Sequence, residues 1–234
     1  MERYPIEVTE KRTVKRVTVR QSFADFLDAF NVERGLVFTV KLLLVKPGKL
    51  IRFYLNEGRF KIVNAFRLLI ITTAVSLVLL SFTNSFEQFY SVQGDSLEQT
   101  EELSQYMNTL FTDWYNLILW LSIPCYALAS WLLLKKFERF NYAEHLVIQT
   151  FFISLNNLIV IAFIPFGFLI GWQEVFAISL VFGFIYYIFL FLDIFRQRNF
   201  WFFFRVFMAF VIGNLFYMIM ISIGLSLMML RYLS

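Results

Sequence analysis

The stretch that decides the fold is KPGKLIRFYLNEGRFKIVNAFR (residues 46–67), followed directly by LLIITTAVSLVLLSF (residues 68–82). The second part carries no charge, and hydrocarbon accepts such a run only as a helix, whose backbone groups bind one another. The first part carries cations against a single acid, Glu57. Cations gathered on one flank of a span predict that this flank lies in the cytoplasm. We call these residues the cationic collar: Lys46, Lys49, Arg52, Arg59, Lys61 and Arg67.

Composition supports a membrane protein. Of the 234 residues, 59% are hydrophobic and 20% aromatic, and the mean hydropathy is +0.66. A water-soluble domain of this size would expose much of that apolar surface, whereas lipid solvates it. The one cysteine, Cys125, excludes a disulfide within the chain and a cysteine-based zinc site.

The chain before the first span divides into two parts. Residues 1–21 predict a basic cytoplasmic tail, and residues 22–64 predict cytoplasmic amphipathic or interfacial helices. Residues 36–45 are apolar, but ten residues cover about half a bilayer, so we expect an interfacial helix there. Pro47 can open a further short helix with Leu50, Ile51 and Tyr54 on one face.

Residues 65–234 predict a domain of five transmembrane helices, with an acidic outer loop at about residues 83–112. Every lysine and arginine except Arg231 lies before or between the spans on the same side as the collar. The fold class is therefore all-α membrane protein, of about five transmembrane helices preceded by short amphipathic interfacial helices. We expect a multi-pass protein of the bacterial cytoplasmic (inner) membrane, with its N-terminus in the cytoplasm and its C-terminus outside.

Polar residues inside the spans are the first candidate site. Asn156, Asn157 and Asn214 lie near the middle of the third and fifth predicted spans. Buried amides usually form interhelical hydrogen bonds, but they could also line a polar path. Both interpretations stay open at this point.

The second candidate is a possible inner-mouth site at Glu144 and His145, where the third span begins. A single histidine without a second histidine or cysteine is more typical of an interface residue than of a metal ligand. Asp193 could be a proton site, but Arg196, Arg198 and Arg205 are close in the sequence, which favours a structural ion pair. Phosphate-binding loops, dinucleotide-binding turns and nucleophile elbows do not occur in the sequence, so we expect no catalytic residue, metal or cofactor.

Two segments resemble a known family. The first segment contains Arg16 and Thr18, Gly35 and Thr39, Pro47-Gly48, Tyr54 and Gly58-Arg59. The second contains Pro124 and Glu144-His145-Leu146. These residues occur in the order common in a family of uncharacterised bacterial integral membrane proteins, the domain of unknown function 3667. Longer members resemble proteins with an N-terminal four-cysteine zinc ribbon, which this chain lacks. The five-span layout is also similar, by topology alone, to Yip1-type membrane proteins. The resemblance implies an architecture and no activity.

Three function classes remain. The cationic collar favours a membrane scaffold or assembly factor that contacts anionic lipids, a protein partner or a second copy of the chain. The alternative is a small transporter or channel subunit with a polar path near Asn156, Asn157 and Asn214. The third is an enzyme using Glu144 and His145, which we set aside. Nucleic acid is not an expected partner, because the basic residues lie close to the predicted spans.

Overall fold

The computed structural model describes residues 35–56, 62–83, 101–137 and 140–233. Every regular element among them is a helix. The longer helices are α4 (Ala65–Phe82), α6 (Glu101–Leu134), α7 (Tyr142–Phe163), α9 (Trp172–Phe195) and α10 (Phe200–Leu233). Short elements precede and connect them: α2 (Val37–Val45), α3 (Pro47–Asn56), η2 (Ile164–Phe166) and α8 (Gly167–Ile170). The predicted basic tail, residues 1–21, and the first part of the segment predicted as interfacial helices, residues 22–34, lie outside the described residues.

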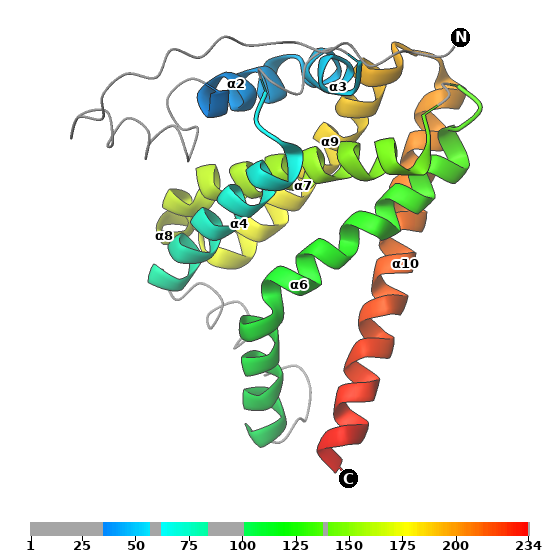
Figure 1. Ribbon diagram of the computed structural model, residues 1–234. Helices are drawn as coiled ribbons and strands as arrows, with labels where there is room; N and C mark the ends of the chain where they lie inside the picture. Colours follow the sequence, from blue (N-terminus) through cyan, green and yellow to red (C-terminus); the bar gives the residue numbers. More distant parts are fainter. Residues whose placement is uncertain (1–34, 57–61, 84–100, 138–139, 234) are drawn as a thin grey trace, which may run out of the picture.

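Five helical segments are long and apolar enough to cross a membrane, as the hydropathy pattern predicts. They are Ala65–Phe82, Leu117–Leu134, Tyr142–Ile170, Trp172–Phe195 and Phe200–Gly224. Their ends alternate, so that α4, α7 and α10 begin on the side where α6 and α9 end (Figure 1). The all-α fold class with five candidate spans is confirmed.

One boundary differs from the sequence-based expectation. Residues 83–112 are predicted as an outer loop, but α6 already begins at Glu101. No proline or glycine occurs between Gly94 and Pro124, so no helix-breaking residue stands before the apolar segment. The helix therefore extends beyond the apolar segment that begins at Leu117.

Helix α7 is the centre of the bundle, because it packs against α4, α6 and α9 and touches α2. Helix α10 packs mainly on α6, and the two long helices form one side of the molecule (Figure 1). In lipid such packing is driven by close van der Waals contact, since lipid tails are as apolar as the side chains.

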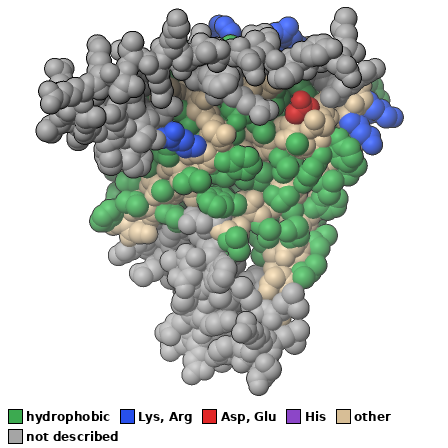
Figure 2. Space-filling model, viewed as in Figure 1, with side chains coloured by type: hydrophobic (Ala, Val, Ile, Leu, Met, Phe, Trp, Pro, Cys, Tyr) green, Lys and Arg blue, Asp and Glu red, His purple; other side chains and the backbone are tan. Residues whose placement is uncertain are grey.

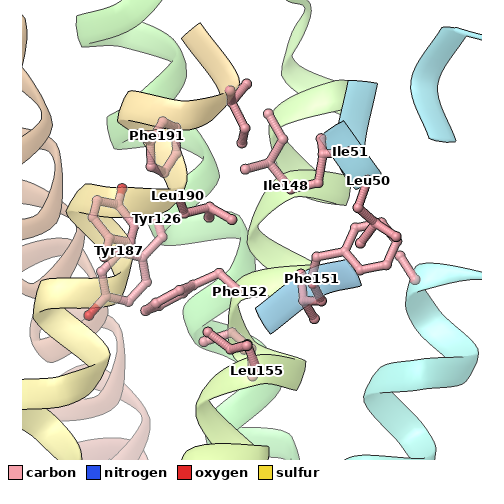
Figure 3. Close-up of a cluster of buried hydrophobic side chains, with 14 of the residues drawn as sticks. Leu50, Ile51, Tyr126, Ile148, Phe151, Phe152, Leu155, Tyr187, Leu190 and Phe191 are labelled. Carbon is pink, nitrogen blue, oxygen red and sulfur yellow. The ribbon is translucent and has the colours of Figure 1, made fainter. Parts of the chain in front are cut away.

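The core reaches from α7 to the short helix α3, which lies across one end of the bundle (Figure 1). Leu50 and Ile51 of α3 are fully buried and point toward Ile148 and Phe151 of α7 (Figure 3). Removing such a side chain from water stabilises the fold by about 1.5–3 kcal/mol. Burial of one face thus fixes α3 on the bundle, whereas Lys49 on its other side is exposed.

Candidate functional site

The joint between α2 and α3 is held against α9 by specific polar contacts. We call residues 43–52 the elbow. The Tyr186 hydroxyl of α9 donates a hydrogen bond to the carbonyl of Leu43, where α2 ends. The guanidinium of Arg52 in α3 donates to the carbonyl of Ile194, near the end of α9. The elbow is therefore bound at both of its ends to one transmembrane helix.

Gly48 makes the closest approach between the elbow and α9. Its N–H donates to the Asp193 carboxylate Oδ2 at 2.7 Å. A Cβ on residue 48 would lie 2.5 Å from the carbonyl oxygen of Asp193 and 2.7 Å from the nitrogen of Ile194, which are backbone atoms. Only glycine fits here without moving one of the two helices. A carboxylate beside the first turn of α3 also interacts favourably with the positive end of that helix.

Thr39 connects α2 to the segment that enters the first span. Its hydroxyl donates to the carbonyl of Gly35 at 2.6 Å and accepts from the N–H of Val63 at 3.1 Å. Thr39 and Val63 are both buried, so neither polar group has water as an alternative partner. Asn64 then caps α4, its side chain accepting from the N–H of Phe66 at 2.9 Å. The Gly35-to-Thr39 spacing is one helical turn, which is what this contact requires.

The cationic collar divides into residues with different surroundings. Lys46 and Lys49 are exposed, whereas Arg67 is half-buried, as is Arg52, which binds α9. Arg59 and Lys61 lie outside the described residues. Lysine and arginine side chains occupy the upper part of the molecule in Figure 2, above a broad apolar belt. Of the collar residues that the structure describes, the two lysines are the exposed ones.

Further cations lie at the same end of the bundle. Lys135 and Lys136 are exposed after the end of α6, and Arg196 and Arg198 are exposed between α9 and α10. Arg205 donates to the carbonyl of Leu133 at 3.3 Å. The charge of this end therefore comes from loops distant in the sequence as well as from the collar.

The three predicted midspan asparagines occupy separate positions. Asn157 is buried and donates to the Thr73 hydroxyl of α4 at 2.9 Å, and it lies 3.4 Å from the Thr72 hydroxyl. Asn156 is half-buried and faces α9, where its amide oxygen lies beside Gly183. Asn214 donates to the carbonyl of Phe210 within α10 at 2.9 Å. The structure does not bring the three amides together.

Glu144 and His145 face different surroundings although they are adjacent in sequence. Glu144 forms a capping box with Asn141, in which each side chain accepts from the other residue's backbone N–H, at 2.7 and 2.9 Å. His145 is fully buried, and its Nδ1 lies 2.9 Å from the Ser130 hydroxyl of α6. The carboxylate thus has a local structural use, and the imidazole points into the bundle. No group of three or more histidine, cysteine or acidic residues suited to a metal occurs in the described part of the chain.

A buried polar chain continues from His145 and is not predicted by the sequence. The Gln149 amide donates to Ser130 at 3.2 Å and lies 3.4 Å from the Tyr187 hydroxyl of α9. His145 and Gln149 are one turn apart on α7. That i, i+4 spacing is the signal that could have indicated a shared face.

The contacts of Asp193 and Tyr186 are the second feature that sequence reasoning missed. Proximity predicts an arginine partner for Asp193, whereas its Oδ2 binds the N–H of Gly48, 145 positions away. The sequence signal for this pairing is weak. Pro47-Gly48 indicates the start of a helix, and the glycine, which has no side chain, allows another helix to approach closely.

Comparisons with known proteins add one similarity. Neither the curated proteins nor the solved structures include a significant match. Residues 33–77 match a family model described as "Protein of unknown function (DUF3667)". This match spans α2, α3 and most of α4. It includes Thr39, Gly48 and the four collar residues that the structure describes: Lys46, Lys49, Arg52 and Arg67. The part of the chain that forms the elbow is therefore the part that is similar to an uncharacterised domain family.

Proposed function

We propose that this chain is a membrane scaffold or assembly factor of the bacterial inner membrane, with its N-terminus in the cytoplasm. The five apolar helices and the match to a domain of unknown function fit a multi-pass membrane protein. The cationic collar is proposed to contact anionic lipids or a protein partner at the inner face. We propose no catalytic activity and no cofactor.

The observation that carries this proposal is the fixed elbow with its exposed lysines. Lys46 and Lys49 lie on a short, apolar-faced segment that α9 holds against the end of the bundle. A rigid surface loses less conformational entropy on binding than a flexible tail does. Each cation near an anionic bilayer surface contributes on the order of 1 kcal/mol.

The test is purification of the full-length protein from its native membrane, followed by identification of the proteins and lipids that accompany it. We expect anionic lipids or a defined partner to be enriched, and the variant Lys46→Gln/Lys49→Gln to recover less of them. The matched control Lys135→Gln/Lys136→Gln removes the same charge at the same end of the bundle. Equal recovery from wild type and both variants would refute a role for the collar.

A transporter or channel subunit is the second candidate. The observation that favours it is the buried polar chain of Ser130, His145, Gln149 and Tyr187 inside the bundle. Polar groups away from lipid often mark a solute pathway. Flux into liposomes that disappears in Gln149→Leu, while the folded protein is retained, would support this candidate over the scaffold.

A further inference from the structure

A second cationic feature lies outside the collar, where α9 ends and α10 begins. A pocket of about 850 Å³ opens between these two helices. Two arginines and one acid line it, together with apolar side chains: Arg196, Arg198, Asp193, Phe189, Phe200 and Phe203. The pocket thus combines a charged part with an apolar part at the end of two membrane-spanning segments.

The local backbone places both arginines at this pocket. Arg196 adopts a left-handed conformation (φ 53°), which ends α9 and turns the chain. The carbonyl of Asn199 then accepts from the N–H groups of Phe202 and Phe203, at 3.0 and 3.1 Å, as α10 starts. The first turn of α10 therefore lies beside the arginines and contributes the positive end of a helix dipole.

Asp193, the acidic residue that lines the pocket, is hydrogen-bonded to α3. The Asp193 Oδ2 accepts from the N–H of Gly48, and the carbonyl of Ile194 accepts from Arg52. Both acceptors, near the end of α9, are thus hydrogen-bonded to residues of the elbow. Arg196 and Arg198 are both exposed, and two arginines against one aspartate give the lining residues a net positive charge.

The phenylalanine side chains that line the pocket are exposed at the surface of the protein. Phe189 is 43% exposed, Phe200 76% and Phe203 41%. A free phosphate ion would gain nothing from these rings, whereas a phospholipid would bury its glycerol and upper acyl carbons against them. Arginine pairs hold phosphate oxygens through bidentate hydrogen bonds.

We propose that this pocket binds one anionic phospholipid, with its phosphate at Arg196 and Arg198 and its acyl chains along Phe189, Phe200 and Phe203. The site is separate from the cationic collar and does not depend on the function proposed for it. Charge complementarity selects an anionic headgroup, and the position at the ends of two spans places the acyl chains in the bilayer.

Native mass spectrometry of the full-length protein released from detergent micelles tests the proposal. The probes are dioleoyl phosphatidylglycerol, dioleoyl phosphatidylcholine with the same acyl chains, and inorganic phosphate. We expect one phosphatidylglycerol to bind preferentially. In Arg196→Gln/Arg198→Gln the Kd for it should rise roughly thirtyfold, because each basic residue near an anionic group contributes about fivefold. The control Lys135→Gln/Lys136→Gln should stay within about twofold of wild type.

Each other outcome overturns the proposal. Equal binding of phosphatidylcholine, or an equal loss in the lysine control, would indicate unspecific adsorption. Displacement by millimolar phosphate would identify a phosphate site. A dimer that is lost in the arginine variant would assign the pocket to a second copy of the chain.

A conservative variant tests the proposal even if Arg196→Gln/Arg198→Gln does not fold. Arg196→Lys/Arg198→Lys keeps both charges but loses the planar guanidinium fork, so the Kd for phosphatidylglycerol should still rise severalfold. Binding as tight as in wild type would overturn the assignment of the phosphate to the arginines.

Discussion

The contact between Gly48 and α9 allows the most demanding prediction. In Gly48→Ala the new Cβ would lie 2.5 Å from the Asp193 carbonyl oxygen, where ordinary contact begins at 3.4 Å. The obstacle is backbone, so α3 and α9 must separate by about 1 Å, and overpacking of this kind costs about 1–3 kcal/mol. The separation also stretches the 2.7 Å hydrogen bond from Gly48 to Asp193.

The expected loss of stability combines this cost of overpacking with two further terms. A hydrogen bond to a charged group contributes about 1.5–3 kcal/mol, and alanine in a helix recovers at most about 1 kcal/mol relative to glycine. We therefore expect Gly48→Ala to lower the free energy of unfolding by about 1.5–5 kcal/mol. If the elbow detaches while the spans stay packed, the loss appears as faster tryptic cleavage after Lys49.

The assay is an SDS unfolding titration of the purified protein in detergent, followed by circular dichroism, together with limited trypsin digestion. The matched control is Gly224→Ala in α10, where a Cβ would meet nothing within 4 Å. This control should be as stable as wild type or slightly more stable. An unchanged unfolding midpoint and an unchanged cleavage rate in Gly48→Ala would refute the reasoning.

Three further predictions concern contacts and topology. Thr39→Val should lower the free energy of unfolding by about 1–3 kcal/mol in the same titration, because it leaves the buried N–H of Val63 without an acceptor, whereas Thr39→Ser should restore it. Asn157→Leu should cost about 0.5–2 kcal/mol through loss of the hydrogen bond to α4; an unchanged midpoint would show that this bond contributes nothing. A cysteine at Gln173 should react with an impermeant thiol reagent in intact cells and one at Asn141 should not, and labelling at Asn141 alone would invert the proposed orientation.

The membrane class and the positions of the spans could be predicted from the sequence because they depend on composition along the chain. An uncharged apolar run must be helical in hydrocarbon wherever its neighbours lie. The short helix α3 was also predictable, since Pro47 opens it and Leu50, Ile51 and Tyr54 fall on the face that is buried. The start of α6 was missed, because residues 101–112 are too polar for a span, although Leu103, Met107, Leu110 and Phe111 recur in them at helical spacing.

The partners of the individual helices were decided by tertiary structure alone. Transmembrane helices are apolar on all sides, so hydropathy does not indicate which face meets a neighbour. The bonds from Gly48 to Asp193 and from Asn157 to Thr73 join residues that the chain separates by 145 and 84 positions. Such pairings depend on shape and close packing between helices, and a linear pattern of residue types does not contain them. For the same reason the sequence indicated a cationic end, but only the folded chain brings Arg196 and Arg198 beside Phe189 and Phe203 in one pocket.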